Sequence, residues 1–293
     1  MKTKILAISL FVSVFLLCGS RTFAQTDLSG EWAARYHEDP IDRRNGPEIG
    51  EYIGLPLNAA ARLHAESWRA NLLNLPEHQC IPHSADYENS FSNLRVWKEI
   101  DPKTQQIIAW HTEMQWMTPI RTIWMDGRPH PPEYAAHTFQ GFSTGEWHGN
   151  MLTVTTTHLK YAWVRRNGVP RSDQATLTEH FVRTGDVLTW ITVVNDPTYL
   201  SEPFIRSRSF VLDPDQTPFP PYPCGPEDEV EESTRPAGFV PHYLPGTNDQ
   251  LFEYADKYGI PHEAVLGGQE TLYPEYKKKL RELLNKQTGQ GGR

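Results

Sequence analysis

Cysteine is scarce in this chain, which has three in 293 residues. Cys18 lies in an N-terminal apolar run and follows Leu17, where lipoprotein processing requires a small residue, so we predict no lipidation. Cys80 and Cys224 are too few and too far apart to indicate a zinc ribbon. An oxidising compartment would permit one disulfide between them, and the sequence leaves open whether they are bonded.

Long apolar runs are also missing, apart from the one at the N-terminus. There Lys2 and Lys4 precede an uncharged stretch from Ile5 to Cys18, and a small-x-small cleavage site follows at residues 22–24. The stretch is shorter than the roughly 20 residues that a membrane-spanning helix needs. These features predict a cleavable signal peptide over residues 1–24, a periplasmic or secreted protein, and no integral membrane segment after cleavage.

Positive charge is in short supply. The net charge of −8 falls to −11 once residues 1–24 are removed, because they contain three cations and no acid. Nucleic acid is itself negatively charged, so with this net charge we do not expect it as a partner. About 269 residues remain, which suits one large domain or a domain with an appendage. A small-molecule ligand or substrate is the partner that we expect, and the oligomeric state stays open.

The chain also lacks the motifs of cofactor sites. It has neither a phosphate-binding loop nor a dinucleotide fingerprint, so we predict no nucleotide cofactor. Its central histidines, among them His130, His137, His158 and His180, never fall at the spacings that place two metal ligands on one face. We therefore predict no metal and no other cofactor.

Alternating apolar and polar residues dominate the middle of the chain. A first strand is expected from Leu28 to Trp32, and Gly149-Asn150 and residues 184–186 look like hairpin turns. Seven further runs predict strands: Leu94–Ile100, Gln106–Met117, Arg121–Asp126, Met151–Leu159, Thr176–Arg183, Val187–Asn195 and Phe204–Leu212. Together with nine tryptophans, this pattern favours a closed antiparallel β-barrel with an aromatic interior, and a sandwich remains the alternative.

Helices are expected only at the margins of this mainly β fold. Asn58 is a suitable cap for a helix over about 58–74. The barrel domain would span residues 25–213 and be followed by a proline-rich and acidic linker over 214–248. A helical C-terminal extension is predicted over 249–293, with helices near Asp249–Lys257 and Pro274–Lys286.

Two long motifs carry a resemblance. They read RTIWMDGRPHPP at residues 121–132 and GFSTGEWHGNMLTVTTT at residues 141–157. With them the chain resembles an uncharacterised family of secreted bacterial proteins over about residues 55–212. The opening Gly30-Glu31-Trp32 is lipocalin-like, whereas Asn150 departs from the Trp-x-Gly-Asp that members of that family often show. The resemblance implies a barrel and brings no activity with it.

Glu179 is the most informative polar residue of the predicted strands. It shares a strand face with Leu177 and Phe181, so its carboxylate is expected to be buried. A buried charge must be paired or have a shifted pKa. Two interpretations stay open: a salt bridge inside the barrel to Arg206 or Arg208, or general acid or base catalysis.

Histidines and a stiff loop supply the other candidates. Alternation places His158 on the buried face of residues 151–159, and His111 shares a face with Glu113; each is either a structural or a proton-transferring group. The loop after Asp126 contains Arg128, His130 and His137, and prolines at 129, 131 and 132 stiffen it, which suits either a rigid site or a protected turn.

The function predicted from these residues is cofactor-free acid–base chemistry of a lyase, hydratase or isomerase type, on a small apolar or cyclic molecule inside the barrel. The catalytic candidates are His158 or His130 as base, Glu179 or Asp126 as acid or orienting group, and Arg121 or Arg206 as anion stabiliser. The substrate-binding candidates are Arg121, Trp124, His137, Trp147, Arg206 and His111.

Two other classes compete with an enzyme. A small-ligand binding or carrier protein of the cell envelope would have its interior charges already paired. A partner-binding envelope protein would use the acidic linker and the helical tail and would have no cavity of ligand size. An enzyme requires His158, Glu179 and the His130 loop to converge on one cavity.

Overall fold

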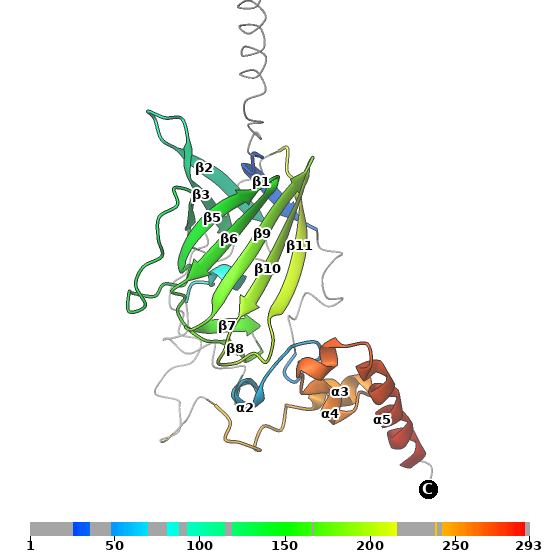
Figure 1. Cartoon of the computed structure of the whole chain (residues 1–293). Coiled ribbons are helices and arrows are strands. Elements are labelled where there is room, and N and C mark those ends of the chain that lie inside the picture. The colour runs from blue at the N-terminus through cyan, green and yellow to red at the C-terminus, as the bar shows by residue number, and fades with distance from the viewer. Residues whose placement is uncertain are drawn as a thin grey trace, which may run out of the picture.

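The structure is a computed structural model that describes residues 26–35, 48–69, 81–87, 93–114, 119–165, 167–215, 238 and 242–290. The predicted signal peptide, Cys80, Cys224 and most of the predicted linker lie outside these residues. Within them the chain forms a mainly β body with helices gathered at one end (Figure 1).

A closed barrel of nine strands makes up most of that body. The strands neighbour one another in the order β1-β11-β10-β9-β6-β5-β4-β3-β2, and β1 closes the ring by pairing with both β11 and β2. Their bounds are β1 (Gly30–Ala34), β2 (Leu94–Ile100), β3 (Ile107–Met114), β4 (Arg121–Trp124), β5 (Phe142–His148), β6 (Met151–Thr157), β9 (Thr176–Thr184), β10 (Val187–Asn195) and β11 (Phe204–Leu212).

The barrel is mixed, so the prediction of a strictly antiparallel sheet is wrong in one place. β4 and β5 run parallel, with Ile123 opposite Ser143 and Trp124 opposite Thr144. The reason lies in the connection between them, residues 125–141, which is too long and too rich in proline for a hairpin turn. It returns the chain so that β5 starts in the same direction as β4. β5 is not among the predicted strands, although the glycine-rich residues 141–145 indicate a strand entry.

The predicted hairpins are confirmed. Gly149-Asn150 joins β5 to β6, with His148 opposite Met151, and Gly185-Asp186 joins β9 to β10, with Thr184 opposite Val187. Both glycines have positive φ, at 66° and 60°, which two-residue hairpin loops require. These turns fix the register of the four central strands.

A short helix and a two-stranded sheet cover one end of the barrel. α2 (Ala59–Glu66) starts where predicted, since the Asn58 side chain accepts a hydrogen bond from the Ala61 amide at 3.0 Å, but it ends at Glu66. β7 (Ala162–Arg165) pairs with β8 (Val169–Arg171) beside it. Gly168 in their turn has φ +94°, and a Cβ there would lie 2.4 Å from the Cβ of Trp68. Only glycine fits this contact.

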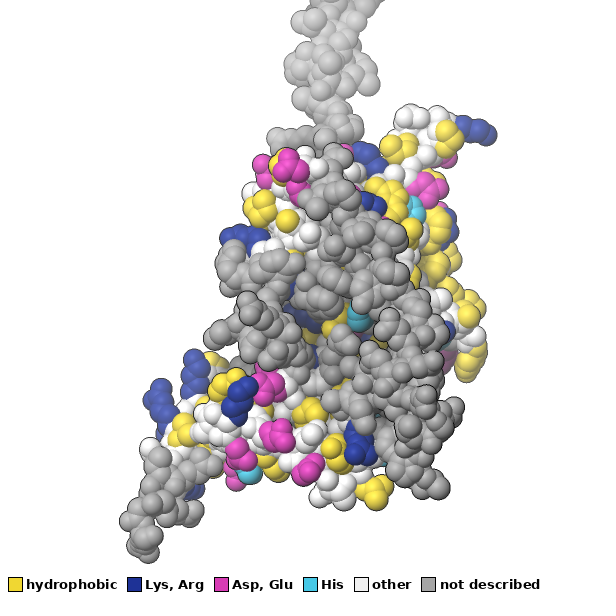
Figure 2. Space-filling model, turned by 180° about the vertical axis from the view of Figure 1, so that it is seen from behind, with side chains coloured by type: hydrophobic (Ala, Val, Ile, Leu, Met, Phe, Trp, Pro, Cys, Tyr) yellow, Lys and Arg dark blue, Asp and Glu magenta, His cyan; other side chains and the backbone are white. Residues whose placement is uncertain are grey.

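The C-terminal extension is helical in part. It contains α3 (Glu253–Tyr258), α4 (His262–Val265), the short 3₁₀ turn η5 (Gln269–Leu272) and α5 (Tyr276–Gln290). Backbone hydrogen bonds from Tyr52 to Val265, at 3.1 Å, and from Gly268 to Leu55, at 2.8 Å, fasten it near α2. Basic side chains gather at its outer end in the view from behind (Figure 2). No helix among the described residues is long and apolar enough to cross a membrane.

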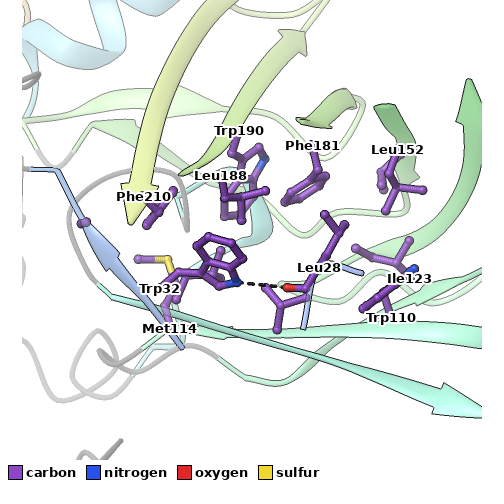
Figure 3. Close-up of a cluster of buried hydrophobic side chains, with 14 residues drawn as sticks. Leu28, Trp32, Trp110, Met114, Ile123, Leu152, Phe181, Leu188, Trp190 and Phe210 are labelled. Atoms are coloured by element: carbon purple, nitrogen blue, oxygen red, sulfur yellow. Dashed lines mark hydrogen bonds between the residues drawn. The ribbon is translucent and has the colours of Figure 1, made fainter. Parts of the chain in front are cut away.

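Two apolar clusters fill the molecule. One lies inside the barrel toward the β9–β10 hairpin and is built on Trp32, Trp110, Trp190, Phe181 and Phe210 (Figure 3). There the Trp32 indole nitrogen donates to the Leu28 carbonyl at 3.0 Å. The other cluster joins the opposite end of the barrel to α2 and β7–β8, and its members include Tyr52, Leu57, Val169, Leu177 and Val194.

Candidate functional site

A layer of polar side chains lies between the two apolar clusters. On β9 the inward residues are Leu177, Glu179 and Phe181, so a single carboxylate sits between two apolar groups, as its alternation predicted. The neighbouring strands place polar residues at the same level. We call this set the polar layer, and it consists of Thr112, Arg121, Ser143, Thr156, Glu179, Thr192, Arg206 and Arg208.

An ion pair between Arg121 and Glu179 is the centre of the polar layer. Both side chains are completely shielded from solvent. Arg121 Nη1 donates to Glu179 Oε1 at 3.2 Å, and Nη2 donates to Oε2. The indole nitrogen of Trp190 donates to the same Oε1 at 3.0 Å. The salt bridge predicted as one interpretation of Glu179 is therefore present, but its partner comes from β4 and is neither Arg206 nor Arg208.

Two hydroxyl groups accept further hydrogen bonds from the Arg121 guanidinium. Its Nε donates to Ser143 Oγ at 3.1 Å and its Nη2 to Thr156 Oγ1 at 2.7 Å, while these two hydroxyls lie 2.9 Å from each other. Because the protein itself takes up these donors, Arg121 is a structural cation in this arrangement. Its predicted role in holding a substrate anion gains no support.

Arg206 differs from Arg121 in having no such partners. It faces Thr192 across the strands, and Thr192 in turn faces Glu179, so about two strand spacings, roughly 10 Å, separate the two backbones. The Nε and Nη2 atoms of Arg206 are buried, and no described residue accepts a hydrogen bond from either. Burial lowers the pKa of Arg206, and the nearby carboxylate of Asp86 opposes this shift.

A second buried ion pair lies beside the polar layer, between Asp86 and Arg171. Asp86 Oδ1 accepts from Arg171 Nε at 3.2 Å and from Ser84 Oγ at 2.7 Å, and both charged side chains are fully shielded. Asp86 belongs to the 3₁₀ turn η3 (Ala85–Tyr87) and Arg171 to the three-residue strand β8. Elements of three residues are too short to show a periodicity, so no pattern in the sequence indicates this pair.

Three histidines gather on the outer surface of the barrel, and we call His130, His137 and His158 the outer histidine cluster. Thr157 Oγ1 lies 2.7 Å from Nδ1 of both His130 and His158, and Nε2 of His158 donates to the Pro132 carbonyl at 3.0 Å. His137 Nδ1 donates to the Leu159 carbonyl at 2.9 Å. Burial lowers the pKa of His130, as does the neighbouring His158. The cluster holds the proline-rich loop against β6.

His158 and Glu179 therefore lie on opposite faces of the sheet. β6 ends at Thr157, and His158 takes φ 57°, so the alternation that placed its side chain inside the barrel does not reach it. Thr156 points inward to Arg121, whereas Thr157 points outward to His158. The prediction that His158 belongs to the buried row is wrong, and the two residues do not converge.

The remaining candidates divide between the same two faces. Asp126 forms a surface ion pair with Arg128, whose guanidinium lies 3.5 Å above the ring of Trp124. His111 stacks on Trp97 outside the barrel and lies 3.2 Å from a Glu99 oxygen. Of the predicted substrate-binding residues, Trp147 joins Arg121 and Arg206 on the inside, packed against the first apolar cluster.

No group of three possible metal ligands occurs in the part of the chain that the structure describes. Comparisons of the chain with protein-family models, with curated proteins and with solved structures find no match. The interior itself is thus the basis for a functional proposal.

Proposed function

We propose that this protein is an exported binding protein that takes up a small organic molecule inside its barrel without transforming it. The observation that carries the proposal is the polar layer, enclosed between an aromatic cluster and a second apolar cluster. Replacing a buried ion pair by apolar residues of similar size is often neutral or stabilising, so stability alone gives little reason for this layer. Apolar walls with a few converging polar groups are typical of small-molecule sites.

The placement of the titratable groups favours binding over acid–base catalysis. Glu179, the one carboxylate of the polar layer, already accepts hydrogen bonds from Arg121 and Trp190. His130 and His158, the proposed bases, lie on the other face of the sheet. A general base must come within hydrogen-bond reach of the proton that it removes, and a molecule inside the barrel is beyond the reach of either histidine.

Binding of a neutral ring compound tests the proposal directly. The probe is N-phenyl-1-naphthylamine, which fluoresces in apolar surroundings and accepts energy from tryptophan, titrated into the chain from Gln25 onward. We expect saturable binding of one probe per chain, with energy transfer from the interior tryptophans. A probe whose fluorescence does not change would refute the proposal.

Two substitutions on β10 make a matched control. Thr192 faces the interior and is completely buried, whereas Thr189 faces outward on the same strand. Thr192→Phe should fill space within the polar layer and weaken probe binding at least tenfold, while Thr189→Phe should leave it unchanged. Equal effects of the two substitutions would place the probe outside the barrel.

A further inference from the structure

Hydrogen-bond donors without acceptors accumulate inside the barrel. The indole nitrogens of Trp110 and Trp147 are buried, and among the described residues neither has an acceptor. The same holds for Nε and Nη2 of Arg206 and for Nη2 of Arg171, whereas Oδ2 of Asp86 and Oε1 of Gln140 are nearby acceptors without a donor. Buried polar groups in folded proteins are normally hydrogen-bonded, so this excess of donors indicates that an acceptor-rich molecule belongs here.

The charge of Arg206 leads to the same conclusion. Two described carboxylates, Glu179 and Asp86, act electrostatically on its guanidinium. Both carboxylates are already paired, Glu179 with Arg121 and Asp86 with Arg171. Burying a cation is costly unless a counter-charge accompanies it. An anion bound inside the barrel would supply that charge.

The orphaned atoms of Arg206 specify the shape of the anion. Nε and Nη2 lie on one edge of the planar guanidinium and present two parallel N–H groups. The two oxygens of a carboxylate match this edge in a bidentate pair, whereas a hydroxyl or a neutral carbonyl would satisfy one N–H group at a time. Arg208 follows Arg206 on the inward face of β11 and lies opposite Trp190, so the aromatic residues of the first apolar cluster begin one inward position beyond Arg206. An apolar ring attached to the carboxylate would point toward that cluster.

We infer that the ligand is a small organic carboxylate with an apolar, ring-shaped body, and that Arg206 holds its carboxylate through Nε and Nη2. This inference rests on the proposed function and adds the chemical class of the ligand. The orphaned indole nitrogens of Trp110 and Trp147 offer hydrogen bonds to further acceptor atoms.

Titration with two isosteric probes tests the inference. 1-Naphthoate and 1-naphthalenemethanol share one ring system and differ in charge and in the bidentate oxygen pair. We expect the wild-type chain to bind the carboxylate at least tenfold more tightly. Arg206→Gln should weaken carboxylate binding about 10- to 100-fold and leave alcohol binding unchanged, because a charge-assisted hydrogen bond is lost only with the anion.

Two further variants act as controls. Arg206→Lys keeps the charge and removes the planar edge, so its affinity for the carboxylate should fall between those of wild type and Arg206→Gln. Arg95→Gln removes a cation that lies on the outer surface, where it pairs with Glu31, and should change neither affinity. Unchanged alcohol binding in all three variants shows that the barrel is intact.

The outcomes separate the two proposals. Equal affinities of wild type for the two probes, or an equal loss of both in Arg206→Gln, would overturn the carboxylate inference and leave small-molecule binding in place. Failure of both naphthalene probes together with N-phenyl-1-naphthylamine would overturn the proposed function itself.

Discussion

The polar layer and the outer histidine cluster lie on opposite faces of one strand, and their contrast shows how access to water decides what a polar residue does. Thr156 and Thr157 are consecutive on β6, and each hydroxyl contacts a basic side chain, Arg121 inside and His130 outside. Inside, every missing partner leaves a group that water cannot reach. Outside, water replaces a lost partner at small cost. An unpartnered polar group on the inner face is therefore costly, and it is there that such a group points to a ligand.

The largest effect should come from removing the carboxylate of the polar layer. Glu179→Gln leaves Arg121 buried without its counter-charge, and we expect the free energy of unfolding to fall by about 3 to 5 kcal/mol in urea titrations. Glu113→Gln is the control, because Glu113 pairs with Arg95 at 3.6 Å on the outer surface, where such pairs contribute less than about 1 kcal/mol. Similar losses in the two variants would erase the contrast between the faces.

The two threonines of β6 allow the sharpest test of the comparison. Thr156→Val removes the acceptor for Arg121 and the partner of Ser143, both buried, and should cost about 1 to 3 kcal/mol. Thr157→Val removes contacts to His130 and His158 at the surface and should cost less than about 1 kcal/mol. Thermal unfolding of both variants measures how much stability each substitution costs. A larger loss for Thr157→Val than for Thr156→Val would contradict the comparison of the two faces.

A third test compares two arginines within the polar layer, Arg206 and Arg121. Arg206→Met removes a guanidinium whose Nε and Nη2 have no described acceptor, so in the absence of ligand it should raise the free energy of unfolding by about 1 kcal/mol. Arg121→Met, which leaves Glu179 unpaired, should lower it. If both variants lose stability equally in urea titrations, Arg206 is a structural residue like Arg121.

The smallest effect concerns pH and the outer histidine cluster. Because the pKa of His130 is lowered in the folded state, the unfolded chain binds more protons as the pH falls below about 6.5. Stability is thus full above that pH and declines below it. His130→Asn should reduce the decline between pH 7.5 and 5.5, measured by urea unfolding at each pH. An unchanged slope would assign the pH dependence to other groups.

Much of the fold could be predicted because strand alternation is a local property. The bounds of β2, β10 and β11 agree with those expected, and the burial of Glu179 follows from its two apolar neighbours on β9. Its partner could not be predicted, since β5 and β6 lie between β4 and β9 in the ring and the sequence does not encode that register. The position of His158 was predicted incorrectly because one residue with positive φ ends the alternation.

The single parallel pair of the barrel follows from its odd number of strands. A ring of strands that alternate in direction all the way round must have an even number of members, so a ring of nine requires an odd number of parallel neighbours. Here that neighbour pair is β4 and β5, which leaves the first and last strands antiparallel, with Trp32 opposite Leu212. The chain consequently enters and leaves the ring at the same rim. Adding a hairpin would preserve this parity, whereas a ring of eight strands needs an even number of parallel pairs, so removing β4 or β5 would leave a wholly antiparallel ring.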